Sequence, residues 1–84
     1  MSNQLTKGTV IGDTDRTVLY ATKVRDAGNG FYATWVALCE KEDAFHRYAV
    51  WTVHDRPDGW SCENGDYCHA IEDAVSFYLE RGGL

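Results

Sequence analysis

Residues 31–54 decide the fold, and they read FYATWVALCEKEDAFHRYAVWTVH. Two runs of aromatic and β-branched residues, 31–39 and 45–54, lie on either side of the charged segment Glu40–Asp43. Aromatic and β-branched side chains favour the pleated surface of a sheet, so each run is predicted to form a β-strand. The charged segment is expected to connect the two strands.

A strand of the same kind is predicted on the N-terminal side, over residues 17–25 (TVLYATKVR). It is followed by Asn29-Gly30, a strong hairpin signal because both residues tolerate positive φ. Residues 8–11 are a further, short strand candidate, which the turn formers at 12–15 would end. Residues 1–7 are polar and are expected to form a flexible arm.

On the C-terminal side, the sequence alternates between turns and one more strand. Arg56–Gly59 (RPDG) is a turn sequence, because Pro presets φ and Gly supplies a left-handed conformation. Residues 60–63 are predicted to return as a strand, and Asn64-Gly65 offers another tight turn. Repeated turns at short spacing favour an antiparallel meander.

A helix is predicted over residues 70–81. Apolar residues recur with helical spacing at Ile71, Ala74, Val75 and Tyr78. Glu72 and Asp73 in the first turn and Arg81 in the last suit the helix dipole. The fold class is therefore α+β: one domain, residues 1–84, with an antiparallel meander of four strands, or five if 8–11 is counted, and one C-terminal helix packed on one face.

One helix can cover only one face of such a sheet. A twelve-residue helix is about 18 Å long and about 10 Å wide, whereas strands lie about 4.8 Å apart, so the helix shields two or three strands. Large apolar side chains nevertheless occur at both parities of the central strands. The second face is expected to be covered by the N-terminal arm, by a second copy of the chain or by another protein, unless the sheet curls and buries both faces.

The uncovered face is the predicted protein-interaction surface. Its candidate residues are Trp35, Trp51, Tyr48 and Tyr32. Either Trp would be the anchor, because Trp is enriched at interface hot spots. Strand register, which the turns do not fix, determines whether Trp35 or Trp51 points outward.

Charge bears on the kind of partner. The chain has thirteen acidic and eight basic residues, a net charge of −5, and its basic residues are spread along the sequence. An acidic surface repels the phosphate backbone, so we expect a protein partner or a homo-oligomer rather than nucleic acid.

The cysteines and the hydropathy bear on location. Cys39, Cys62 and Cys68 are an odd number, which is not a disulfide framework. The N-terminus has no apolar signal-peptide run, and no stretch approaches the ~20 apolar residues of a membrane span. The chain is expected to be cytoplasmic, with reduced thiols and no membrane association.

No residue pattern specifies chemistry. Cys62, Cys68 and His69 are zinc-ligand types, but their C-x5-C-H spacing lacks the usual C-x2-C pair. Cys68 precedes the predicted helix, where a helix N-terminus would lower its pKa. A Cys nucleophile also needs a nearby base, and His69 is adjacent in sequence, but sequence neighbours need not face one another. There is no phosphate loop or nucleophile elbow. We therefore expect no catalytic residue, cofactor or metal, and no enzyme activity.

Two resemblances bear on function. The stretch Trp60–Arg81 resembles the strand-into-helix segment of AP2-type and integrase-arm DNA-binding domains, which read the major groove with the sheet. Those domains carry a basic sheet, whereas the strands here hold only Lys23, Arg25 and Arg47. A small nucleic-acid-binding module is therefore the alternative rather than the leading hypothesis.

The second resemblance covers about two-thirds of the chain. The segments Trp51–Val53, Asp58–Tyr67, Ile71–Val75 and Arg81–Gly83 are similar to small proteins of actinobacteriophages. The resemblance implies a viral protein made inside a bacterial cell and carries no activity over. The leading hypothesis is a non-catalytic protein-interaction module, acting on a host or phage protein or by self-association.

Overall fold

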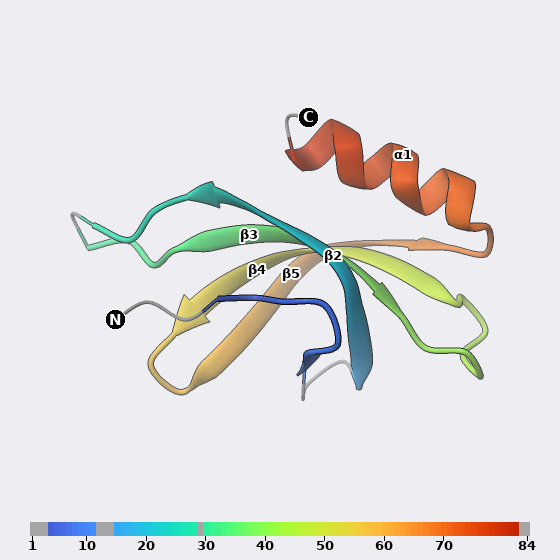
Figure 1. Cartoon of the computed structure of the whole chain (residues 1–84), viewed down its shortest axis with the longest axis horizontal. Helices are drawn as coiled ribbons and strands as arrows, with labels where there is room; N and C mark the ends of the chain where they lie inside the picture. The colour runs from blue at the N-terminus through green and yellow to red at the C-terminus, as the bar shows by residue number, and fades with distance from the viewer. Residues whose placement is uncertain (1–3, 12–14, 29, 83–84) are drawn as a thin grey trace.

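A computed structural model describes residues 4–11, 15–28 and 30–82. In this part of the chain, five antiparallel strands lie side by side in chain order, and one C-terminal helix packs against the sheet (Figure 1). The elements are β1 (Val10–Ile11), β2 (Arg16–Arg25), β3 (Thr34–Glu40), β4 (Tyr48–Arg56), β5 (Gly59–Cys68) and α1 (Ile71–Gly82). The predicted α+β meander is confirmed, with the short β1 as its fifth strand.

The hairpin connections agree with the predicted turns where the structure describes them. β4 and β5 are joined by a turn at Pro57-Asp58. Between β2 and β3, Gly28 and Phe31 form an isolated antiparallel bridge, with N···O distances of 3.1 and 2.8 Å. Asn29 of the predicted Asn29-Gly30 turn and residues 12–14 of the turn before β2 are outside the described residues.

The predicted turn at Asn64-Gly65 is wrong, because these residues form a bulge inside one long strand. The register passes from Val50 opposite Asp66 to Thr52 opposite Glu63, so Trp51 faces two residues of β5. Asn64 takes the left-handed conformation that such a bulge needs, with φ of +54°. Gly65 lets the Trp51 ring lie directly on the backbone, since an added Cβ would be 2.6 Å from Trp51 Cζ3.

The bulge is closed by a side chain from the end of the helix. The Arg81 guanidinium donates hydrogen bonds to the carbonyl oxygens of Val50, at 2.8 Å, and Asn64, at 2.6 Å. It also donates to Asp66 Oδ2, at 3.1 Å, and to Thr52 Oγ1. Arg81 therefore satisfies acceptors of both strands around the bulge and fixes the C-terminal end of α1 on the sheet.

The helix packs on one face of the sheet. Its buried positions, Ala74 and Tyr78, belong to the predicted apolar stripe. They join a cluster formed with Val36, Leu38, Val50 and Cys68. This cluster makes up the first of two hydrophobic cores.

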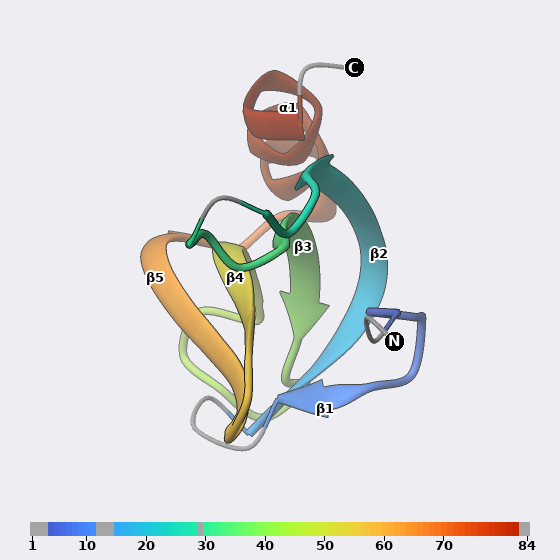
Figure 2. The ribbon, with the colours of Figure 1, turned by 90° about the vertical axis from the view of Figure 1, so that its left-hand side faces the viewer.

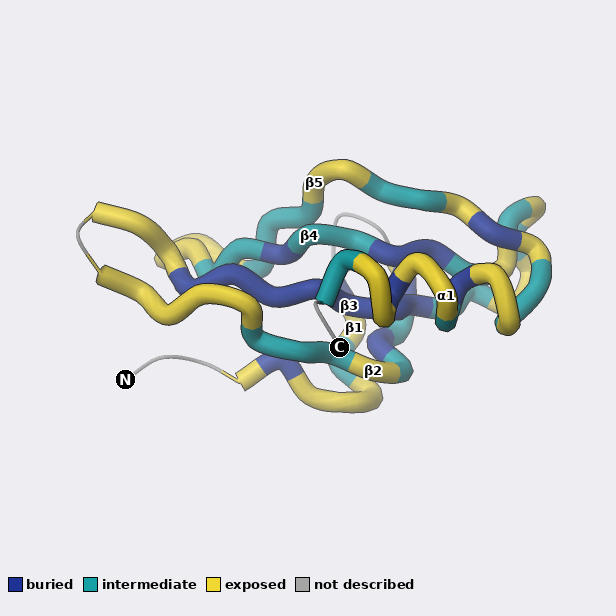
Figure 3. The backbone as a smooth tube through the Cα atoms, turned by 90° about the horizontal axis from the view of Figure 1, so that it is seen from above, coloured by how far each residue is buried: buried dark blue, intermediate teal, exposed yellow. Residues whose placement is uncertain are grey.

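The opposite face is covered by the chain itself. The sheet curls strongly (Figure 2), and described residues that precede β2 pack against the face opposite the helix. Leu5 and Ile11 are buried there, at 3% and 0% exposure, in a second core with Val18, Trp35, Ala37, Cys39 and Val53. Residues 1–3 of the predicted flexible arm are outside the described residues, but Leu5 is part of this core. With a core on each side, β3 is buried along most of its length (Figure 3).

Candidate functional site

The structure does not bring the four predicted interaction residues together on one exposed face. Trp35 and Trp51 both face away from the helix, into the second core or its margin. Trp35 is only 6% exposed and packs edge-on against Trp60, with ring centroids 6.4 Å apart. Trp51 is half-buried and packs edge-on against Tyr67. Trp35 is therefore a core residue in this conformation and not an accessible anchor.

The two predicted tyrosines are more accessible than Trp35 but lie apart from one another. Tyr48 is half-buried in the helix-side core, and the Arg47 guanidinium lies 5.5 Å from its ring centroid. Tyr32 is 41% exposed in the connection before β3, with the Arg56 guanidinium 5.3 Å from its ring. Neither tyrosine lines the apolar groove between the helix and the sheet.

An apolar groove lies instead between α1 and β2. It is lined by Tyr20, Val75, Tyr78 and Leu79, and its volume is about 220 Å³. Within this lining, the rings of Tyr20 and Tyr78 pack in a tilted arrangement, with centroids 6.2 Å apart. Tyr20 and Leu79 are 56% and 43% exposed, so the groove opens to solvent.

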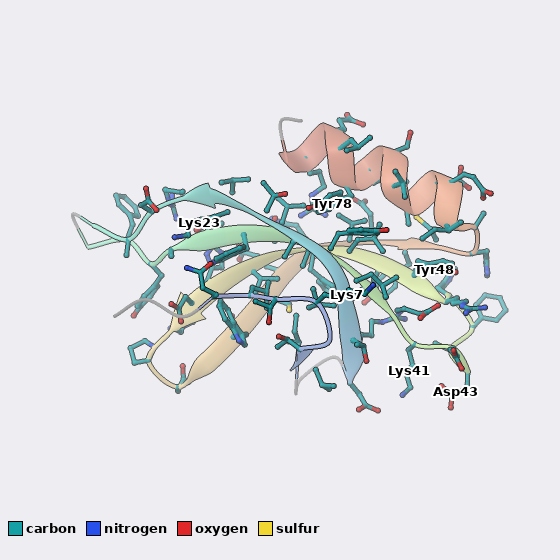
Figure 4. The ribbon with its side chains drawn as sticks, in the orientation of Figure 1. Lys7, Lys23, Lys41, Asp43, Tyr48 and Tyr78 are labelled. Atoms are coloured by element: carbon teal, nitrogen blue, oxygen red, sulfur yellow. The ribbon has the colours of Figure 1, made fainter. Side chains whose placement is uncertain are left out.

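Tyr78 holds the two sides of this groove together. Its ring points from α1 towards the sheet (Figure 4), and its hydroxyl lies 2.6 Å from Thr22 Oγ1 of β2, within hydrogen-bonding distance. Because Tyr78 is buried, this contact fixes the distance between the helix and the strand. The groove is thus formed in the unbound chain, as is usual for binding sites.

The backbone edge of β2 beside the groove is open. β1 pairs with Arg16 and Thr17, and among the described residues the backbone groups of Gly8 and Thr9 reach β2 only at Val18. Within the described ranges, the backbone of residues 20–25 is paired with β3 alone. An unpaired strand edge is a row of amide and carbonyl groups ready to accept another strand.

The open edge is basic, although the protein is acidic. Of the three basic residues of β2, Arg16 is buried and lies where β1 pairs, so the open segment Tyr20–Arg25 carries Lys23 and Arg25 and no acidic residue. Lys23, labelled in Figure 4, lies over the Trp35 ring at 5.5 Å, so its side chain is on the sheet face opposite the groove. Its ion pair with Asp26, at 3.3 Å, joins an exposed carboxylate within the same segment, and such a pair exchanges easily for another anion.

The groove residues Tyr20 and Leu79 were missed at the sequence level. Leu79 follows Val75 at i+4 and so extends the apolar stripe of the helix beyond the part that the sheet can bury. The width of this apolar stripe was the signal in the sequence that could have indicated Leu79 as an exposed apolar residue. Nothing in the sequence indicated that Tyr20 would lie opposite it, because their contact depends on where the helix crosses β2.

A second group of exposed rings lies at the other end of the sheet. Phe45 is 84% exposed and packs edge-on against His46 and His69, with centroids 4.9 and 5.1 Å away. The two imidazoles are 4.4 Å apart, and Tyr67 adjoins His46. These rings pack on one another around the β3–β4 loop.

Among the described residues, the cysteines and histidines form neither a disulfide nor a group placed to hold a metal ion. Burial raises the pKa of Cys68, and Asp73 and Asp66 add to this effect, so the predicted lowering by the helix N-terminus is wrong. The three cysteines, all within the described ranges, form no disulfide. In the same ranges, no group of three or more His, Cys, Asp or Glu side chains is placed to hold a metal ion.

Comparison with known proteins adds no further assignment: no protein-family model, curated protein sequence or solved structure matches this chain. Across residues 4–11, 15–28 and 30–82, no helix has both the length and the apolar character needed to cross a membrane.

Proposed function

We propose that this protein is a non-catalytic interaction module that binds a segment of another protein in the groove between α1 and β2. The observation that carries the proposal is an apolar groove, lined by Tyr20, Val75 and Leu79, directly beside an unpaired strand edge. Solvent-exposed apolar surface of this kind marks interaction sites in small domains. The buried Tyr78 supports the proposal because it holds the groove open without a ligand.

The cellular location and the source of the partner that we propose rest on features of the sequence. We place the protein in the cytoplasm, where thiols stay reduced, in agreement with three cysteines that form no disulfide. Its resemblance to small actinobacteriophage proteins makes a bacterial host the first place to look for the partner. Nucleic acid receives no support from a net charge of −5.

Site-specific photo-cross-linking tests this proposal. A photoreactive phenylalanine analogue replaces Leu79 in the groove or, as the control, Asp58 in the exposed β4–β5 turn, and each chain is irradiated in a lysate of the bacterial host. We expect a discrete adduct with another protein from position 79 and none from position 58. Unlabelled wild-type chain should compete for the adduct, and unlabelled Leu79→Glu should not.

Three results would count against the proposal. Equal adducts from both positions would show that capture is not specific to the groove. Competition by Leu79→Glu as strong as by wild type would show that the groove is not used. An adduct with the mass of two copies of this chain would show that the groove binds a second copy and not another protein.

A further inference from the structure

We infer that the groove recognises a short, extended, acidic segment, which binds by adding a strand to the open edge of β2. This inference rests on the proposed function and specifies the partner's conformation and chemistry. In strand addition, backbone hydrogen bonds supply affinity, and pockets for alternate side chains supply specificity. Both features are present at this edge.

The incoming strand would continue the position that β1 begins. Gly8 to Ile11 occupy the edge beside the start of β2, and the chain before them turns away, with a hydrogen bond from Thr9 N to Thr6 O and φ of +93° at Gly8. The rest of the edge, Tyr20–Arg25, is about 20 Å long, at ~3.3 Å per residue. That length suits a segment of about six residues.

The irregularities of β2 limit what can bind there. Register shifts lie between Val18 and Tyr20 and between Lys23 and Arg25, so the regular pairing of the open segment with β3 is limited to Tyr20–Lys23. Bulges and a charged residue on an edge are the features that prevent long edge-to-edge pairing. They disfavour a second copy of the ten-residue β2 and leave room for a short segment.

The two faces of β2 determine the side-chain pattern of the ligand. On the helix side, the groove is walled by Tyr20 and Leu79 and calls for apolar side chains. On the opposite side, the added strand would pass Lys23, which calls for a carboxylate. Because side chains alternate between faces, the predicted ligand alternates apolar and acidic residues.

The test uses isotope-labelled full-length protein and capped peptides. The probe is a hexapeptide of alternating valine and aspartate, and the basic control replaces each aspartate with lysine. We expect the acidic probe to shift the amide resonances of Tyr20–Arg25 and slow their hydrogen exchange. The basic control should bind at least about tenfold more weakly. Lys23→Glu should reduce that preference, and Arg56→Glu, in the β4–β5 hairpin, should preserve it.

Backbone methylation isolates the binding mode without altering the protein. One acidic peptide is N-methylated at its valines and another at its aspartates. Only alternate amides of an added strand face β2, so one of these peptides should lose binding and the other should keep it.

Two results would overturn strand addition. One is equal binding by the two N-methylated peptides, and the other is the absence of any change at Tyr20–Arg25 with saturating acidic probe. If the cross-link from position 79 is still obtained, the groove remains a binding site and only the mode of recognition is rejected. Equal binding of acidic and basic probes would overturn the proposed charge preference.

Discussion

At the scale of single residues, Arg81 and Gly65 explain why β5 can remain one strand. The bulge at Asn64-Gly65 leaves carbonyl groups without ladder partners, and Arg81 donates to two carbonyls beside it. Gly65 provides the space that the Trp51 ring fills. The helix end, the bulge and the aromatic side chain therefore form one structural unit.

Removing the Arg81 guanidinium should cost stability because it leaves acceptors around the bulge unsatisfied. For Arg81→Met, which keeps much of the aliphatic stem, we expect the free energy of unfolding to fall by about 2–3 kcal/mol. Arg56→Met is the matched control, since Arg56 is exposed, and should lose less than about 1 kcal/mol. Equal losses in urea unfolding would contradict the role assigned to Arg81.

Cys39 makes stability depend on alkaline pH. Its thiol is fully buried, and burial, followed by the neighbouring Cys62, raises its pKa from 9.0 to about 12 despite an opposing effect of Arg16. A raised pKa in the folded state means that the stabilisation is complete below about pH 9 and is lost as pH rises towards about 12. Between about pH 8 and about pH 10, this group should remove about 1 kcal/mol from the free energy of unfolding.

The variant Cys39→Ala isolates this contribution, because every other titrating group is retained. We expect the variant to be less stable throughout but to lose less stability than wild type between these two pH values. Parallel curves of unfolding free energy against pH would show that Cys39 does not titrate in this way.

At the level of elements, described residues that precede β2 cover the sheet face that α1 leaves uncovered, as a second helix would in a larger domain. Leu5 and Ile11 cover the sheet face opposite α1, and the curl of the sheet brings Val18 and Val53 into the same core. In a chain of 84 residues, a core on each side of one sheet makes use of most of its large apolar side chains.

Two leucine truncations test this cover. Leu5→Ala should lower the free energy of unfolding by about 2–3 kcal/mol, the usual cost of a cavity in a core. Leu79→Ala, at the exposed groove, should cost less than about 1 kcal/mol. The red shift of Trp fluorescence expected for Leu5→Ala should be absent in Leu79→Ala. An unchanged free energy of unfolding in Leu5→Ala would mean that Leu5 does not cover the sheet.

Local patterns predicted the elements, and long-range geometry decided the site. Alternation along residues 45–54 predicts Trp51 and Val53 on one face and Tyr48 and Val50 on the other, and the two cores confirm this division. The burial of Trp35 could not be foreseen, because it depends on the curl of the sheet and on where Leu5 lies. Asn64-Gly65 predicts a turn but forms a bulge, because a tight turn and a bulge of this kind both need a left-handed backbone conformation and a glycine.

At the scale of the whole molecule, the sheet has no large apolar face left to present. Both faces of the curled sheet (Figure 2) carry a core, so the partner surface that we propose is the β2 edge with the adjoining groove and not a face of the sheet. The acidic chain places three basic residues on this one strand. Self-repulsion by the net charge of −5 would keep copies apart, and the basic edge remains attractive to an acidic segment.

Residue-resolved hydrogen exchange of the free protein, at a concentration where it is monomeric, tests the central claim most directly. With the β2 edge open, amides of β3 should exchange slowly throughout, whereas protection along Tyr20–Arg25 should alternate between amides bonded to β3 and amides facing solvent. Slow exchange at every amide of Tyr20–Arg25 would show that part of this chain already covers the edge and would contradict the proposed binding surface.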